Sequence, residues 1–126
     1  GEPVALRLTP DREALAGDGR DTVPVTVEAI DAQGRPVPTA NLPVELELSG
    51  PGANIGVGNG DPNSHDPEKG NRVRIYNGLA QVILQSRRAG SGDLVLRATS
   101  AGLKPSETTI QVRAVPAPPS IAVLAP

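Results

Sequence analysis

Glu45 and Glu47 form the first pair of side chains in this sequence whose type and spacing could do chemistry. Hydrolysis of a glycosidic bond uses two carboxyl groups about 5–10 Å apart across a cleft, and two alternate residues of one strand face come within that range. The residues that alternate with them are apolar, as in an ordinary strand with one solvated face. Such a face neither raises a carboxyl pKa nor excludes water, so we interpret both glutamates as surface residues.

His65 is the only histidine of the chain, so any acid–base chemistry that uses histidine must use it. It stands between Ser64 and Asp66, which are the residue types of a catalytic triad. A triad is a spatial arrangement, and side chains of consecutive residues rarely face one another as nucleophile, base and orienting group. We therefore predict no catalytic residue in this chain, and expect His65 to order its own loop or to contact a neighbouring domain.

Oxygen ligands for a metal ion are more plausible than catalysis. Calcium binds six to eight oxygens supplied by flexible loops, and the same stretch of chain holds several carboxylates and amides. The spacing does not match an EF-hand, and Asn and Asp are also the usual residues of turns. We predict no cofactor and keep Ca²⁺ open at two weak candidate sites. One is Asp18 with Asp21, and the other comprises Asn59, Asp61, Asp66 and Glu68.

Sugar binding usually relies on aromatic rings that stack on the apolar face of a sugar. Tyr76 is the one aromatic residue in the sequence. One ring does not make a binding platform, so a packing role is the simpler interpretation of Tyr76. Carbohydrate stays open as a possible partner.

Composition limits the remaining functions. The chain has 126 residues, enough for one domain, and lacks Phe, Trp, Met and Cys, so Val, Leu, Ile and Ala must fill its core. With 14 Gly and 14 Pro, frequent turns are expected and long helices are not. The net charge of -2 without a block of like charge argues against a nucleic-acid partner. No apolar run approaches the roughly 18 residues of a membrane span, so we expect no membrane partner.

The order of polar and apolar residues predicts about seven to eight short strands. Residues 22–29 alternate most clearly, with Val23, Val25, Val27 and Ala29 on one face. Pro24 cannot donate a hydrogen bond to a neighbouring strand, so it must lie at a sheet edge or near the start of its strand. The other expected strands are residues 4–8, 12–16 (a small edge strand or a turn), 44–48, 72–76, 79–86, 93–99 and 108–113.

Short strands at this spacing, separated by turns, predict an all-β fold of the immunoglobulin-like β-sandwich type. We expect residues 1–115 to form this domain and residues 116–126 to be a proline-rich tail or linker. The expected core consists of Val25, Val27, Leu46, Leu48, Leu79, Val82, Leu84, Leu94, Leu96, Ile110 and Val112.

A long polar stretch interrupts this pattern. From residue 53 to about residue 71 the chain is rich in Gly, Asn, Asp and Pro and is too irregular for a helix or a strand. A plain connector needs about two to five residues, and longer loops in compact domains are usually functional. We expect residues 56–68 to dock on a neighbouring domain, with a self-contained surface loop as the alternative. The docking residues would be Gly58, Asn59, Gly60, Asp61, Ser64 and His65.

The same stretch carries a resemblance to a known family. The sequence reads GVGNGDPNSHD over residues 56–66, Arg at residue 72, and YNGLAQVILQS over residues 76–86. This resembles the C-terminal immunoglobulin-like domain of bacterial glycoside hydrolase family 2 enzymes, the β-galactosidase group, whose pattern has Glu at the position of Asp66 and usually Phe at that of Tyr76. Shorter features resemble bacterial Ig-like group 1 domains of the invasin and intimin type: DG at residues 18–19, DAQGRPVP at 31–38, NGLA at 77–80 and AG at 89–90.

The resemblance implies a non-catalytic accessory domain that braces or frames the catalytic barrel of a family 2 β-galactosidase. The partners would then be the other domains of that glycosidase. A carbohydrate-binding module and an adhesin-type spacer are the alternatives, and the long loop favours the domain of an enzyme over a spacer. We expect an excised module of a bacterial protein found in the periplasm or outside the cell, with its targeting signal elsewhere.

Overall fold

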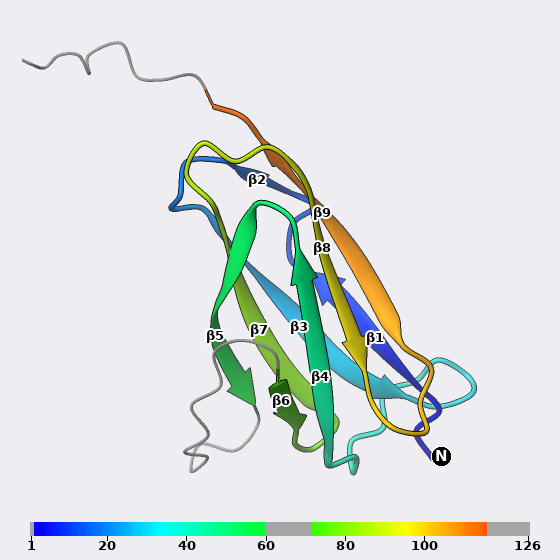
Figure 1. The fold of residues 1–126 in the computed structure, drawn as a ribbon. Coiled ribbons are helices and arrows are strands. Elements are labelled where there is room, and N and C mark those ends of the chain that lie inside the picture. Colours follow the sequence, from blue (N-terminus) through cyan, green and yellow to red (C-terminus); the bar gives the residue numbers. More distant parts are fainter. Residues whose placement is uncertain (1, 60–71, 116–126) are drawn as a thin grey trace, which may run out of the picture.

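The computed structural model of the chain describes residues 2–59 and 72–115, in which all regular structure is β-strand (Figure 1). No helix long and apolar enough to cross a membrane occurs in these two ranges. The all-β prediction is confirmed, with nine strands in the described ranges where about seven to eight were expected. In chain order they are β1 (Ala5–Pro10), β2 (Ala14–Ala16), β3 (Thr22–Ile30), β4 (Leu42–Ser49), β5 (Gly52–Asn59), β6 (Arg72–Ile75), β7 (Leu79–Ser86), β8 (Gly92–Thr99) and β9 (Ser106–Arg113).

The strands form two sheets that pack face to face as a sandwich. Sheet A has four strands in the order β1-β3-β7-β5, and sheet B has five in the order β2-β9-β8-β4-β6. All pairings are antiparallel except that of β2 with β9, which is parallel. The edge strands β5 and β6 contact each other on one side of the sandwich, and β1 contacts β9 on the other.

Aliphatic side chains of alternate residues fill the space between the sheets. In β3 the inward face carries Val23, Val25, Val27 and Ala29, each fully buried, as the alternation predicted. Its neighbour β7 places Val82 and Leu84 beside them, and β8 of the opposite sheet contributes further leucines. Branched aliphatic residues suit such half-buried pleated surfaces, so they fill the core although the chain has no Phe, Trp or Met.

Pro24 lies near the start of β3, which is an interior strand of sheet A. β1 pairs with β3 only from Val25 onward, and the Asp11 amide then donates to the Pro24 carbonyl (2.9 Å). The nitrogen of Pro24 therefore faces the side where β1 has already ended, and no ladder hydrogen bond is lost there. The prediction of a strand start is confirmed.

The expectation that the polar stretch begins as a loop at residue 53 is wrong. Residues Gly52–Asn59 form β5, which pairs with β7 along its length. The register shifts between Asn54 and Gly56, where the ladder contains a bulge, and a bulge disturbs the regular alternation that marks a strand in a sequence. Three glycines in this strand also conceal it, because glycine is depleted in strands.

The core prediction is wrong at Leu79 and overstated at Leu48, and the other nine residues are buried. Leu79 is 45% exposed because Ala80, Val82 and Leu84 take the inward face of β7, which turns the odd-numbered residues outward. Leu48 lies near the end of β4 and packs only in part against the core.

A tight turn at Asn77 and Gly78 carries the chain from β6 in sheet B to β7 in sheet A. Both residues have positive φ, 55° and 81°, and the Tyr76 and Leu79 backbones exchange two hydrogen bonds across the turn. Asn-Gly is the preferred pair for such a turn. A Cβ on Gly78 would also lie 2.3 Å from the Val37 carbonyl oxygen, so only glycine fits.

Candidate functional site

Most residues of the expected docking loop lie outside the described residues, namely Gly60, Asp61, Ser64, His65, Asp66 and Glu68. Gly58 and Asn59 are described by their backbones and belong to β5, where they pair with Gln81 and Ala80 of β7. The segment 60–71 therefore begins at the edge strand of sheet A and ends at β6, the edge strand of sheet B. Its two ends are held on the same side of the sandwich.

The structure places Glu45 and Glu47 on the exposed outer face of β4, as the sequence predicts. Glu45 lies opposite Arg72 of β6, with 3.6 Å between Oε2 and Nη2, and both side chains are more than half exposed. Each glutamate is thus a solvated member of a cross-strand charge pattern, and such exposed pairs contribute little to stability.

A shallow hollow of about 490 Å³ lies over β4, β8 and β9. Glu47 and Glu107 line it, and Arg97 stands between them because β8 pairs with β4 on one side and with β9 on the other. All three side chains are exposed. Arg97 fills the space between the two carboxylates, and the hollow is open to water, so it is not a cleft that holds a sugar between an acid and a nucleophile.

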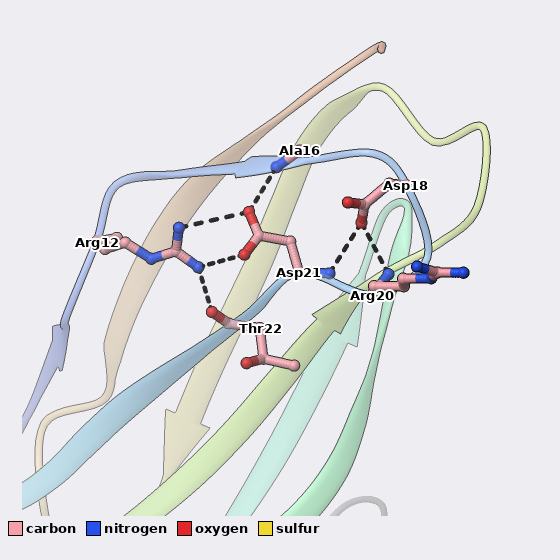
Figure 2. A network of polar contacts seen from close by, with 6 residues as sticks. All are labelled: Arg12, Ala16, Asp18, Arg20, Asp21 and Thr22. Atoms are coloured by element: carbon pink, nitrogen blue, oxygen red, sulfur yellow. Dashed lines mark hydrogen bonds and ion pairs between the residues drawn. The ribbon is translucent and has the colours of Figure 1, made fainter. Parts of the chain in front are cut away.

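Asp18, one of the weak candidates for a cation, holds the turn that leads into β3 (Figure 2). Its Oδ1 accepts hydrogen bonds from the amides of Arg20 (2.8 Å) and Asp21 (2.9 Å). These two donors, Arg20 first, hold the pKa of the Asp18 carboxyl below its usual value. The arrangement is that of an aspartate capping its own turn.

Asp21, its expected co-ligand, bonds to three other donors in the same view (Figure 2). Its carboxylate accepts from both terminal nitrogens of the Arg12 guanidinium, with 2.6 Å between Oδ1 and Nη2 and 3.4 Å between Oδ2 and Nη1, and from the Ala16 amide at 2.9 Å. Arg12 also donates to the Thr22 carbonyl, so it ties the crossover between β1 and β2 to the start of β3. The hydrogen bond from Arg12 is the main reason that the pKa of Asp21 is lowered, and the same bond raises the pKa of Arg12.

These protein donors explain how the Asp18 and Asp21 carboxylates are held in place without a bound cation. Within residues 2–59 and 72–115 no three His, Cys, Asp or Glu side chains gather as metal ligands. Of the second set of candidates, only the backbone of Asn59 falls in the described ranges.

Tyr76 packs at the end of β6, where the Arg74 guanidinium carbon lies 5.9 Å from the centre of its ring. A cation at this distance is attracted to the face of the ring. Tyr76 is partly buried, which fits the packing role expected for it.

The outer face of sheet A is a feature that the sequence reasoning missed. In the middle of this face Pro24 lies opposite Ile83, which lies opposite Gly56, and in the next row Thr26 lies opposite Gln81. These side chains are uncharged, and they run across three neighbouring strands. The sheet therefore presents a nearly continuous neutral surface.

Only two charged residues occur in the four strands of sheet A, Arg7 and Glu28, and they form an ion pair with 3.0 Å between Nη2 and Oε1. Arg7 also donates to the Gly34 carbonyl (2.9 Å). The outer face of sheet B is different, because charged side chains of both signs cover it. They are Glu45, Glu47, Arg72, Arg74, Asp93, Arg97, Glu107 and Arg113, all exposed. Counting charges per strand would have revealed the contrast, once the strands were assigned to their sheets.

Comparison with known proteins identifies the family. Residues 6–109 match the family model described as glycoside hydrolase family 2 C-terminal domain 5. Among curated proteins, a β-galactosidase of Bacteroides ovatus is 38% identical over 104 residues, covering 82% of this chain and 12% of the relative. A β-glucuronidase of Formosa agariphila is 34% identical over 115 residues, covering 88% of this chain and 11% of the relative.

Solved structures agree with this match. A glycosyl hydrolase family 2 member from Bacteroides cellulosilyticus superposes with a TM-score of 0.85 at 26% identity, covering 90% of this chain and 14% of that one. A family 2 β-glucuronidase superposes with a TM-score of 0.81 at 33% identity, covering 94% and 12%. The chain thus spans about an eighth of the length of these relatives. It belongs to the family of C-terminal domains (domain 5) of glycoside hydrolase family 2.

Proposed function

We propose that this chain is a non-catalytic accessory domain that braces the catalytic domain of a family 2 glycosidase. The observation that carries the proposal is the match of residues 6–109 to a domain defined by its C-terminal place in these enzymes. The chain spans only 12% of the β-galactosidase relative, so most of such an enzyme lies in other domains. Those domains are the proposed partners.

The described carboxylates support a non-catalytic role. Glu45 and Glu47 stand on an open strand face, and Asp18 and Asp21 accept hydrogen bonds within their own turns. A glycosidase needs an acid and a nucleophile or base on either side of a bound sugar, in an environment that raises one carboxyl pKa. Glu45 and Glu47 share one open face, and the Asp18 and Asp21 carboxylates are held by donors of their own turns, so none of the four lies across a sugar-binding cleft from another. In our proposal the hydrolytic pair therefore belongs to another domain.

The parent enzyme in this proposal is a β-galactosidase, as the first relative is. A β-glucuronidase is the second choice, because relatives with that name match almost as well. We place the enzyme in the periplasm or outside a bacterial cell. In the same proposal the segment 60–71 contributes contacts to the neighbouring domain, since both of its ends are fixed at adjacent sheet edges.

The proposal is tested by removing the domain from the parent enzyme. We expect the isolated chain to leave aryl β-galactosides intact, while the parent enzyme without residues 6–115 loses activity or unfolds at a lower temperature. The measurements are initial rates of hydrolysis and thermal unfolding of the parent with and without the domain. Equal activity and equal melting temperature of the two forms would refute the bracing role.

A control addresses hydrolysis by the chain itself. If the purified chain hydrolyses an aryl β-galactoside, Glu45→Gln and Glu47→Gln variants show whether the strand face is responsible. Activity that survives repurification and disappears with either substitution would show that the domain is catalytic, contrary to the proposal.

A further inference from the structure

We propose that the outer face of sheet A is the surface that packs against a neighbouring domain of the same polypeptide, while the outer face of sheet B stays in water. This inference rests on the proposed function, because it names the surface through which the bracing acts. It concerns a face built from β1, β3, β7 and β5.

Charge separates the two faces. Burying an unpaired charge in an interface costs several kcal/mol, and charged residues are depleted from interface centres. Covering sheet A would bury little unpaired charge, because Arg7 and Glu28 already neutralise each other at 3.0 Å. Covering sheet B would bury exposed charges on β4, β6, β8 and β9 together. Only sheet A can be covered at low electrostatic cost.

Apolar exposure points to the same face. In the described residues the exposed large hydrophobic side chains are Val4, Ile55, Leu79 and Val115. Ile55 (40% exposed) lies in β5 and Leu79 (45%) starts β7, so two of the four belong to strands of sheet A. The other two lie outside the strands, Val4 directly before β1 of sheet A and Val115 two residues after β9 of sheet B. No strand of sheet B carries one in this part of the chain. Between Ile55 and the far edge of the sheet, Ile83 and Pro24 continue the apolar surface.

Gly56 adds a steric argument. A Cβ built on Gly56 would meet no described atom within 4 Å, and its φ is not positive. Neither the backbone conformation nor the packing of the described residues therefore requires glycine here, although glycine weakens a strand interior. A second surface lying close against the β5 backbone would require it, because glycine allows the closest approach.

The neighbour we infer is the domain that precedes this one in the chain. A C-terminal domain is joined to the rest of its polypeptide through its first strand, and β1 is an edge strand of sheet A. Val4 stands at this entry, 39% exposed, with its amide bonded to the Ile30 carbonyl of β3 (2.8 Å). The preceding domain is thus attached beside the neutral face, and it should present a flat, uncharged surface of its own.

The sequence offers a direct test, because it contains no cysteine. Thr26→Cys places one thiol on the outer face of sheet A, and Thr109→Cys places one on the outer face of sheet B as a matched control. The rate of alkylation of each thiol is measured in the 126-residue chain and in the full-length parent protein. Mass spectrometry of the peptide that carries the substitution gives the rate in both.

We expect the Thr26→Cys thiol to react at least about tenfold more slowly in the parent than in the chain, because thiol reactivity depends on access. The Thr109→Cys thiol should react at the same rate in both. Equal rates for Thr26→Cys, or protection of Thr109→Cys in its place, would overturn the inference. Protection of Thr26→Cys that grows with concentration in the 126-residue chain would also overturn it, by showing that the face binds a second copy.

Failure of this inference is distinguishable from failure of the proposed function. If Thr26→Cys stays reactive while removal of the domain still lowers the stability of the parent, the bracing role stands and the face is wrong. If removal of the domain changes nothing in the parent, the bracing role itself is refuted.

Discussion

Three aspartates, Asp18, Asp21 and Asp31, share one property that sets the response of this domain to acid. Asp31 is 6% exposed, and its Oδ1 accepts from the amides of Gln33 (2.9 Å) and Arg35 (3.0 Å). The Arg35 amide is the main reason that its pKa is lowered, as backbone amides lower the pKa of Asp18 and Arg12 that of Asp21. The folded chain therefore stabilises the ionised form of each of these carboxyl groups more than the unfolded chain does.

We predict that the domain loses stability as the pH falls below about 4, the usual range of an aspartate pKa. The unfolded chain then takes up protons at these carboxylates while the folded chain still resists protonation, so protons favour unfolding. Asp21→Asn should lower the melting temperature at pH 7 and flatten its fall between pH 5 and about 2.5. Melting curves over this pH series test the prediction, and an unchanged slope in Asp21→Asn would contradict it.

Ser86 is a residue whose hydroxyl contributes nothing visible to stability. It is 4% exposed, and its Oγ has no hydrogen-bond partner in the part of the chain that the structure describes. Ser86→Ala should therefore leave the free energy of unfolding unchanged or raise it by up to about 1 kcal/mol. Ser106→Ala is the matched control: its Oγ accepts from the Leu8 amide (3.2 Å), so we expect a loss of about 1 kcal/mol in denaturant titrations.

At the scale of the strand, β3 and β5 show what the sequence can and cannot predict. β3 alternates without interruption over nine residues, so its inward face was correctly assigned to Val23, Val25, Val27 and Ala29. β5 has glycines in place of side chains and a bulge after Asn54, so neither periodicity nor composition marks it as a strand. Its hydrogen bonds to β7 hold it there, and such long-range pairing has no local signal in the sequence.

The two leucines Leu96 and Leu79 test the assignment of strand faces. Leu96 of β8 is 1% exposed, so Leu96→Ala should lower the free energy of unfolding by about 2–5 kcal/mol through the cavity it leaves. Leu79 is 45% exposed, so Leu79→Ala should cost less than about 0.5 kcal/mol in the isolated chain. Urea titration of both variants measures the difference. Similar losses at the two positions would mean that β7 presents its opposite face to the core.

Gly52 and Gly56, in the same strand, should respond differently to alanine. A Cβ on Gly52 would lie 2.8 Å from the Gln85 carbonyl oxygen and equally close to Leu94, so Gly52→Ala should destabilise the chain by about 1–3 kcal/mol. Gly56→Ala meets open space among the described atoms and should change stability by no more than about 0.5 kcal/mol. A large loss for Gly56→Ala in the isolated chain would show that glycine is needed within the domain itself.

At the scale of the whole molecule, the sequence predicted the family and the sandwich and missed the contrast between its faces. The motif around residues 56–66 carried the resemblance, and the family match over residues 6–109 confirms it. The neutral face of sheet A could not be predicted in the same way. Its members come from four strands that are neighbours only in the folded sheet, and one of these, β5, was not recognised.

The charged face of sheet B also accounts for the candidates that the sequence raised. The spacing of Glu45 and Glu47 matches that of a hydrolytic carboxyl pair. In the folded sheet their cross-strand neighbours are Arg72 and Arg97. Alternating signs across neighbouring strands keep an exposed sheet face soluble and discourage pairing with other sheets. The glutamates are explained by the sheet to which they belong and need no active site.

The parallel pairing of β2 with β9 has a mechanical consequence. β1 begins at one end of the sandwich and β9 finishes at the other, as Figure 1 shows. A pull applied through the two ends of the domain therefore draws β2 and β9 in opposite directions along their length. The hydrogen bonds between β2 and β9 lie across that direction. They are therefore loaded together in shear and do not break one after another. The β2–β9 pair therefore resists separation of the two ends of the domain.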